Sequence, residues 1–247
     1  MTPPEHAAQP EPARAELAVL RQSTDRLLAA VSGATGEAPE VRAPSLLPGW
    51  TRGHVLTHLA RNADALRNVV SGRPMYTGVE ARDADIEAGA PRPLPEQVED
   101  VRVSAERLAA LLADVPAERW RQRVELRNGV TDLLLNIPFR RRVEVELHLV
   151  DLGIGPTSDD LPEDFADRAI GYLADRFAGR PEVSPAEVRT ADGRIWRTGR
   201  RAEAAAGPDR PVLVTGTPGA LVGWLSGRAP GADLGTDGGA LPVLPAL

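Results

Sequence analysis

Apolar residues recur at steps of three and four positions in three segments of the first half of the chain, which is the period of a helix with one buried face. The segments run from about Ala15 to Gly33, from the N-cap Thr51 to Gly72, and onward from Pro95, with a polar connection over residues 73–95. The stripes predicted to be buried are Leu17, Leu20, Leu27, Leu28 and Val31 in the first helix, Val55, Leu59, Leu66, Val69 and Val70 in the second, and Val98, Val101, Ala105, Leu108, Leu112 and Val115 in the third.

A fourth apolar segment, from about Asn136 to Leu152, has an ambiguous pattern. Residues 143–149 alternate strictly between apolar and polar side chains, which by period alone predicts a strand. The segment is longer than a typical strand, however, and the three preceding helices offer no strand for it to pair with. We therefore predict a helix that completes a four-helix bundle.

The composition changes after residues 153–156, and the rest of the sequence alternates between helix and strand patterns. One helix is predicted over about residues 162–177, followed by a hairpin around Asp192-Gly193, a third strand and a last helix that begins at Thr217. The hairpin strands are residues 187–190 and 194–197, and the third strand is residues 211–216.

The expected fold class is therefore α+β, with an N-terminal four-helix bundle and a small C-terminal α+β domain. We place the bundle at residues 13–158 and the small domain at residues 159–247. Residues 1–12 contain four prolines and few apolar side chains, so we expect them to be a disordered leader.

Composition narrows the class of protein. The 247 residues are 42% hydrophobic and 26% charged, enough to bury a core and too apolar for a disordered chain. The net charge of −6 and the interspersed charges argue against a nucleic-acid partner. The apolar runs are far shorter than the roughly 20 residues of a membrane span, and the N-terminus lacks the order of a signal peptide. We expect a soluble cytoplasmic protein.

All 29 basic residues are arginine, which together with abundant Ala, Gly and Pro is typical of a high-GC bacterium.

The chain contains no cysteine. This excludes disulfides, thiolate metal ligands and a cysteine nucleophile, and it leaves His, Asp and Glu as the available metal ligands. Any thiol chemistry therefore needs a thiol that another molecule supplies.

Histidines and a glutamate are spaced so that they can form a metal site. His54 and His58 are four residues apart, as are Glu144 and His148, so each pair lies on one face of its helix. Two facing helices can project such pairs inward, and two histidines with one carboxylate leave an open position on a divalent metal. Such spacings also occur in histidines that only pack at a helix surface, and either His54 or His58 can supply the ligand.

Four segments resemble a known family. Residues 47–63, LPGWTRGHVLTHLARNA, resemble the L-x-G-W-T/S-x-x-H-h-x-x-H-h-A-x-N-A segment of mycothiol-dependent maleylpyruvate isomerases, members of the DinB-like metal-binding bundle superfamily. Residues 74–89 are similar to the P-M-Y-x-x-x-E-A-R-x-x-x-I-x-x-G stretch of these isomerases, residues 141–153 to their second ligand helix, and residues 219–228 to the last helix and Gly-Arg of their small domain. The resemblance covers about residues 13–230.

The resemblance implies a zinc site and assigns its ligands. The ligands expected from the family are His58, Glu144 and His148, and His54 becomes a residue of the helix face. The family resemblance also favours a helix through residues 143–149. Arg228, in the C-terminal domain, matches an arginine that functions in the family, and Arg82 is a second candidate catalytic arginine. Arg141 occupies a matching family position from which it can hold Glu144. Asp151 can orient a ligand histidine, but a structural role at the helix end is favoured for it.

The reaction implied by the resemblance is the cis-to-trans isomerisation of maleylpyruvate to fumarylpyruvate, a step of gentisate degradation. A mycothiol thiolate would add to the activated alkene, the resulting single bond would rotate, and the thiolate would leave. Two alternatives are a mycothiol S-transferase acting on another electrophile and a non-enzymatic zinc-binding regulator. The residues that bind the thiol and the oligomeric state are left open by the sequence, and a monomer is compatible with it.

Overall fold

The computed structural model describes residues 10–33, 38–200 and 210–246. The chain divides into two compact units, Met1–Ile154 and Gly155–Leu247, and each is described by itself. The boundary expected from the sequence, after residue 158, lies four residues into the second unit. His6 and most of the expected leader lie outside the described residues.

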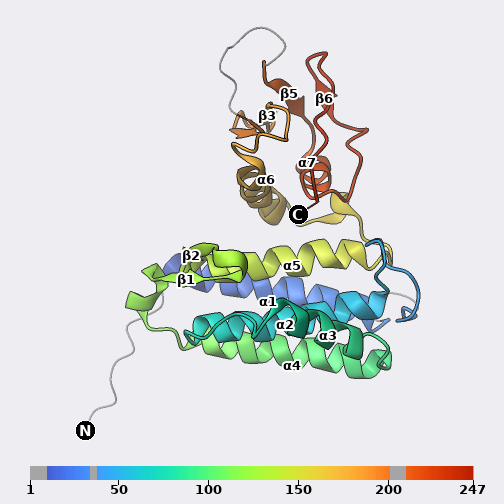
Figure 1. Cartoon of the computed structure of the whole chain (residues 1–247), viewed down its shortest axis with the longest axis vertical. Coiled ribbons are helices and arrows are strands. Elements are labelled where there is room, and N and C mark those ends of the chain that lie inside the picture. The colour runs from blue at the N-terminus through green and yellow to red at the C-terminus, as the bar shows by residue number, and fades with distance from the viewer. Residues whose placement is uncertain (1–9, 34–37, 201–209, 247) are drawn as a thin grey trace. The chain divides into compact units, whose positions relative to one another are not determined.

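The first unit is a bundle of four long helices (Figure 1). These helices are α1 (Glu11–Val31), α2 (Arg52–Val70), α4 (Leu94–Ala113) and α5 (Ile137–Asp151). α2 packs against α4 and α5, and α1 packs against the same two helices. The alternating segment at residues 143–149 lies inside α5, so the prediction of a helix is confirmed.

Helix boundaries follow local chemistry. Thr51 caps α2 by accepting from a backbone N–H of the first turn, as its residue type predicts. Proline lies in the first turn of α1, α4 and α5, where its missing N–H costs no helical hydrogen bond. Because Pro12 fits this position, α1 begins at Glu11, and the expectation that the leader extends through residue 12 is wrong at its last two residues.

Two elements between the long helices were not predicted. The expected polar connection contains α3 (Val79–Gly89), which packs on α2. Of the α3 residues that the structure describes, only Ile86 and Gly89 are buried, so no apolar stripe marks this helix in the sequence. The strands β1 (Arg123–Glu125) and β2 (Thr131–Leu133) form a short antiparallel hairpin before α5. Three-residue strands are too short for a period of two to be recognised.

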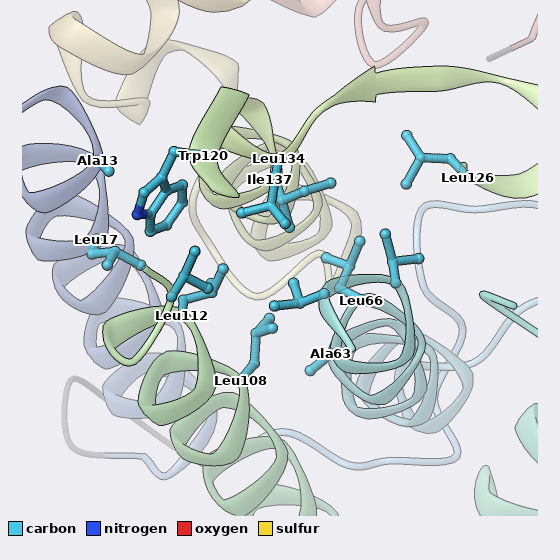
Figure 2. Close-up of a cluster of buried hydrophobic side chains, with 13 residues drawn as sticks. Ala13, Leu17, Ala63, Leu66, Leu108, Leu112, Trp120, Leu126, Leu134 and Ile137 are labelled. Carbon is cyan, nitrogen blue, oxygen red and sulfur yellow. The ribbon is translucent and has the colours of Figure 1, made fainter. Parts of the chain in front are cut away.

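The core of the bundle consists of two apolar clusters. One surrounds the buried Trp120, and Figure 2 shows this side chain among residues from α1, α2, α4 and the start of α5. The other is built from residues of α1, α2, α4 and α5 near their opposite ends. Its buried members include Leu27, Leu56, Leu59, Val101 and Leu149. These clusters hold α2 and α5 in a fixed register, because tightly packed side chains resist sliding.

The second unit is a small α+β domain (Figure 1). It contains η4 (Ser158–Asp160), α6 (Glu163–Phe177), β3 (Ala186–Arg189), β4 (Ile195–Thr198), β5 (Val212–Thr215), α7 (Pro218–Leu225) and β6 (Gly235–Thr236). The sheet order is β4-β3-β5-β6, with β3 and β5 parallel and the other neighbours antiparallel. The helices, the hairpin and the third strand are thus confirmed, whereas β6 was not predicted. None of the described helices is long and apolar enough to cross a membrane.

Candidate metal centre

Three side chains from two helices converge inside the bundle. His58 comes from α2, and Glu144 and His148 come from successive turns of α5. One potential ligand atom from each lies within 4.8 Å of the other two. Oε2 of Glu144 lies 3.0 Å from Nε2 of His58 and 3.2 Å from Nε2 of His148. The structure therefore brings together the three residues that the resemblance selected, with both imidazoles directing the same nitrogen to one carboxylate.

The far side of His148 is held by a buried carboxylate. Nδ1 of His148 lies 2.8 Å from Oδ2 of Asp151, whose side chain is 1% exposed. A carboxylate accepts here, so Nδ1 carries the hydrogen and Nε2 is oriented toward Glu144. Asp151 thus orients the histidine in the way that carboxylates orient metal-bound histidines in proteins.

The far side of His58 faces an arginine instead. Nη2 of Arg82, on α3, lies 3.3 Å from Nδ1 of His58. A guanidinium can only donate, so Nδ1 accepts and Nε2–H donates to Glu144. Arg82 also pairs with Asp83 at 2.6 Å, and the ring of Trp50 packs on His58 with centroids 5.5 Å apart. Arg82, which the family resemblance gives as a candidate catalytic arginine, therefore lies in contact with a candidate ligand residue.

Electrostatics in the cluster favour a charged Glu144. Burial raises the pKa of Glu144, but hydrogen bonds from His148 and His58 outweigh it and hold that pKa well below the usual range. Burial also lowers the pKa of His148, yet its hydrogen bonds to Asp151 and Glu144 raise the net value. Burial dominates at His58 and lowers its pKa. The cluster therefore holds one carboxylate and two imidazoles of unequal basicity.

This donor set fits a zinc ion. Zinc is bound by imidazole nitrogens and carboxylate oxygens, and sites with three protein ligands keep a fourth position for water or substrate. The Glu144 side chain is 34% exposed, so the site remains open to a small molecule. Within the parts of the chain that the structure describes, this is the group of three His, Asp or Glu residues with metal-binding geometry.

Comparison with known proteins places both units in one family. The mycothiol maleylpyruvate isomerase N-terminal domain matches residues 6–153, and the C-terminal domain of the same family matches residues 160–246. The chain belongs to this family. No sequence among the curated proteins matches it significantly.

Two solved structures have the same fold. They are a mycothiol-dependent maleylpyruvate isomerase and a histidine-to-alanine mutant of that isomerase. Each is 24% identical to this chain, with a TM-score of 0.79 over 95% of this chain and 97% of the other. The likeness shows that this chain and the isomerase share a fold.

His54 lies outside the cluster because it caps the helix that carries His58. Its Nδ1 accepts from the backbone N–H of Thr51 at 3.1 Å, while Oγ1 of Thr51 accepts from the backbone N–H of His54 at 3.4 Å. Its other nitrogen, Nε2, lies 3.3 Å from Glu87 on α3. The signal in the sequence is the spacing Thr-x-x-His, a capping box with histidine in the place of the usual glutamate.

Arg141 is fully buried one turn before Glu144. It donates to Oδ1 of Asn62 at 2.8 Å, whereas its Nε and Nη2 have no hydrogen-bond partner among the described residues. Burial lowers the pKa of Arg141 to about 10, opposed mainly by the charge of Glu144. Arg141 therefore acts on Glu144 as a nearby charge and not through a direct hydrogen bond.

Arg228 lies in the second unit, just after α7. Its Nη1 donates to the carbonyl of Ser226 at 2.6 Å, and the side chain is partly buried. The geometry of the metal centre is complete within the first unit, so the catalytic role of Arg228 remains a prediction from the family resemblance.

Proposed function

We propose that this family member is a zinc- and mycothiol-dependent isomerase that converts maleylpyruvate to fumarylpyruvate in gentisate degradation. The observation that carries the proposal is the His58, Glu144 and His148 cluster in a chain whose two units both match the isomerase family. We place the reaction in the cytoplasm, as the sequence analysis expects.

The reaction requires rotation about a carbon–carbon double bond. A thiolate that adds to one alkene carbon converts that bond to a single bond, with the electron pair delocalised onto the neighbouring carbonyl. After rotation, the electron pair returns, the carbon–sulfur bond breaks and the thiolate leaves unchanged. Because the chain has no cysteine, a thiol nucleophile has to come from another molecule, which we propose is mycothiol. Zinc held by the three ligands supplies positive charge that stabilises a thiolate or polarises a carbonyl oxygen.

Arg82 is the first-unit residue best placed to bind the substrate. A neutral imidazole that gives its Nε2 lone pair to a metal carries its proton on Nδ1. Arg82 would then face a donor at His58 and would turn to another acceptor. A planar guanidinium suits a carboxylate, and maleylpyruvate has two of these. We propose Arg82 and Arg228 as the arginines that hold the substrate carboxylates.

The test is to mix zinc-loaded protein with maleylpyruvate, with and without mycothiol, and to follow both product and thiol. Fumarylpyruvate that forms only with mycothiol, without net loss of thiol, supports the isomerase. Consumption of the thiol would replace the proposal with an S-transferase, and no reaction would favour a regulator. Arg228→Ala should bind zinc normally and turn over poorly, whereas unimpaired turnover would remove Arg228 from the site.

A further inference from the structure

A positively charged groove lies on the surface of the first unit, beside the metal centre. It has a volume of about 570 Å³. It is lined by residues 72–76 and 78, which follow α2, and by residues of the 119–129 segment, which includes β1. We call it the arginine groove, because four arginines and a single acidic residue line it. Its charged residues are Arg73, Arg119, Arg123, Glu125 and Arg127.

The β1–β2 hairpin presents this charge on a rigid support. Side chains alternate along its first strand, so Val124 and Leu126 pack on the Trp120 cluster, while Arg123, Glu125 and Arg127 are exposed. Asn128 and Gly129 form the tip, both with left-handed backbone (φ 59° and 71°), as a tight hairpin turn requires. The buried face and the turn together fix Arg127 at the rim of the groove.

The arginines of the groove have no acidic partners among the described residues, unlike many others in the chain. Arg119 donates to a backbone carbonyl and to Gln122, and Arg123 donates to Thr131. In contrast, Arg102 on α4 pairs with two glutamates. In a protein of net charge −6, a groove with three more positive than negative side chains is a local reversal of sign. Such a concave positive surface concentrates anions.

Tyr76 connects the groove to the metal centre. It lines the groove and is partly buried, and burial raises the pKa of its hydroxyl, so the hydroxyl stays a donor at neutral pH. Its electrostatic neighbours are Arg82 and Glu144 on the metal-centre side and Arg127 on the groove side. A ligand that reaches from Arg82 past Tyr76 to Arg127 would therefore meet donors along its whole length.

We propose that the arginine groove binds the carboxylate end of an elongated organic anion whose other end lies at the metal centre, with Arg127 and Arg73 as the recognising residues. The volume is within the range of small-molecule sites and is much larger than one carboxylate needs. The groove thus selects ligands by length as well as charge. It can do so whether or not the isomerisation is catalysed.

The test measures binding of linear dicarboxylates, from succinate to suberate, and of inorganic phosphate to the full-length protein by titration calorimetry. We expect affinity to rise with chain length, and Arg127→Gln and Arg73→Gln each to weaken binding of the longest probe about five- to tenfold. Arg121→Gln is the matched control, because Arg121 is exposed in the same segment but does not line the groove. It should change affinity less than twofold.

Three outcomes would overturn the proposal. These are equal weakening by Arg121→Gln and Arg127→Gln, phosphate binding as tight as that of the longest dicarboxylate, and no binding of any probe at millimolar concentration. A circular dichroism melt of each variant separates loss of binding from loss of fold. Because the readout is binding and not turnover, a failure of the isomerase assay would leave this result interpretable.

Discussion

Two glutamates that lie two positions apart on α5 have opposite surroundings. Glu144 faces α2 and meets the imidazoles of His58 and His148. Glu146 is fully buried and meets two guanidiniums, forming a direct ion pair with Arg26 of α1 and lying 3.9 Å from Nε of Arg142. On one face of α5, Glu144 therefore lies among histidines, which can lose their protons. On another face, Glu146 lies among arginines, which stay positively charged.

The difference shows how partners decide what a carboxylate can do. Arginine is a permanent cation at physiological pH, so Glu146 always faces positive partners, and its ion pair with Arg26 joins α5 to α1. Imidazoles lose their protons near neutral pH and then have lone pairs to give. Glu144 and its two histidines can therefore exchange protons for a metal ion, whereas Glu146 cannot.

The largest effect should come from substituting the candidate zinc ligands one at a time. His58→Ala and His148→Ala should each lose bound zinc, because two remaining donors hold the ion far more weakly than three. Glu146→Gln and His54→Ala should each retain one zinc ion per chain. Metal content is measured by mass spectrometry after gel filtration. Retention of zinc by His58→Ala together with its loss in His54→Ala would reverse the ligand assignment.

The second prediction concerns stability. Glu146→Ala removes a fully buried carboxylate that pairs with Arg26 and lies 3.9 Å from the buried Arg142, so the free energy of unfolding should fall by about 3 to 5 kcal/mol. Glu144→Ala in zinc-free protein should cost about 1 kcal/mol or less, because Glu144 is partly exposed and its partners can be neutral. Urea denaturation followed by circular dichroism measures both. Equal losses of unfolding free energy in the two variants would contradict the contrast between Glu144 and Glu146.

The third prediction concerns the hydrogen bond between Asp151 and His148. Asp151→Asn keeps the size of the side chain and removes its charge, so it should weaken zinc affinity about 10- to 100-fold. Competition with a chromogenic chelator measures the affinity. Asp83→Asn is a suitable control, since Asp83 pairs with Arg82 and touches no ligand histidine in the described contacts. An unchanged affinity in Asp151→Asn would show that the buried carboxylate is only structural.

The smallest expected effect is on pH dependence. Because the pKa of His148 is raised in the folded protein, protons compete with zinc from a pH above 6.5 downward. Zinc affinity should then fall about tenfold for each pH unit below that pKa. In Asp151→Asn the partner that raises the pKa is weakened, so the decline should begin at a lower pH. A decline at the same pH in both proteins would mean that another group titrates.

Much of the fold could be predicted because long periodic segments carry their own signal. The stripes of α1, α2 and α4 and the turn between β3 and β4 are local patterns, and all of these elements form where the patterns indicate. The helix α3 and the strands β1 and β2 could not be predicted, since they are short and their burial depends on partners distant in sequence. The arginine groove depends on the same hairpin, so no local pattern in the sequence predicts it.

The sequence by itself determined the long helices of the bundle, the family and the absence of a thiol, because residue types and local periods decide these properties. Spacing could not choose between His54 and His58, which lie one helical turn apart. The cap of α2 that takes up His54 is a local contact with Thr51, whereas only the tertiary structure decided that α5 brings Glu144 and His148 to His58. It likewise brought Arg82 to the far side of His58 and left Glu146 on a face occupied by arginines. These are contacts between distant segments, and packing of the four helices sets them.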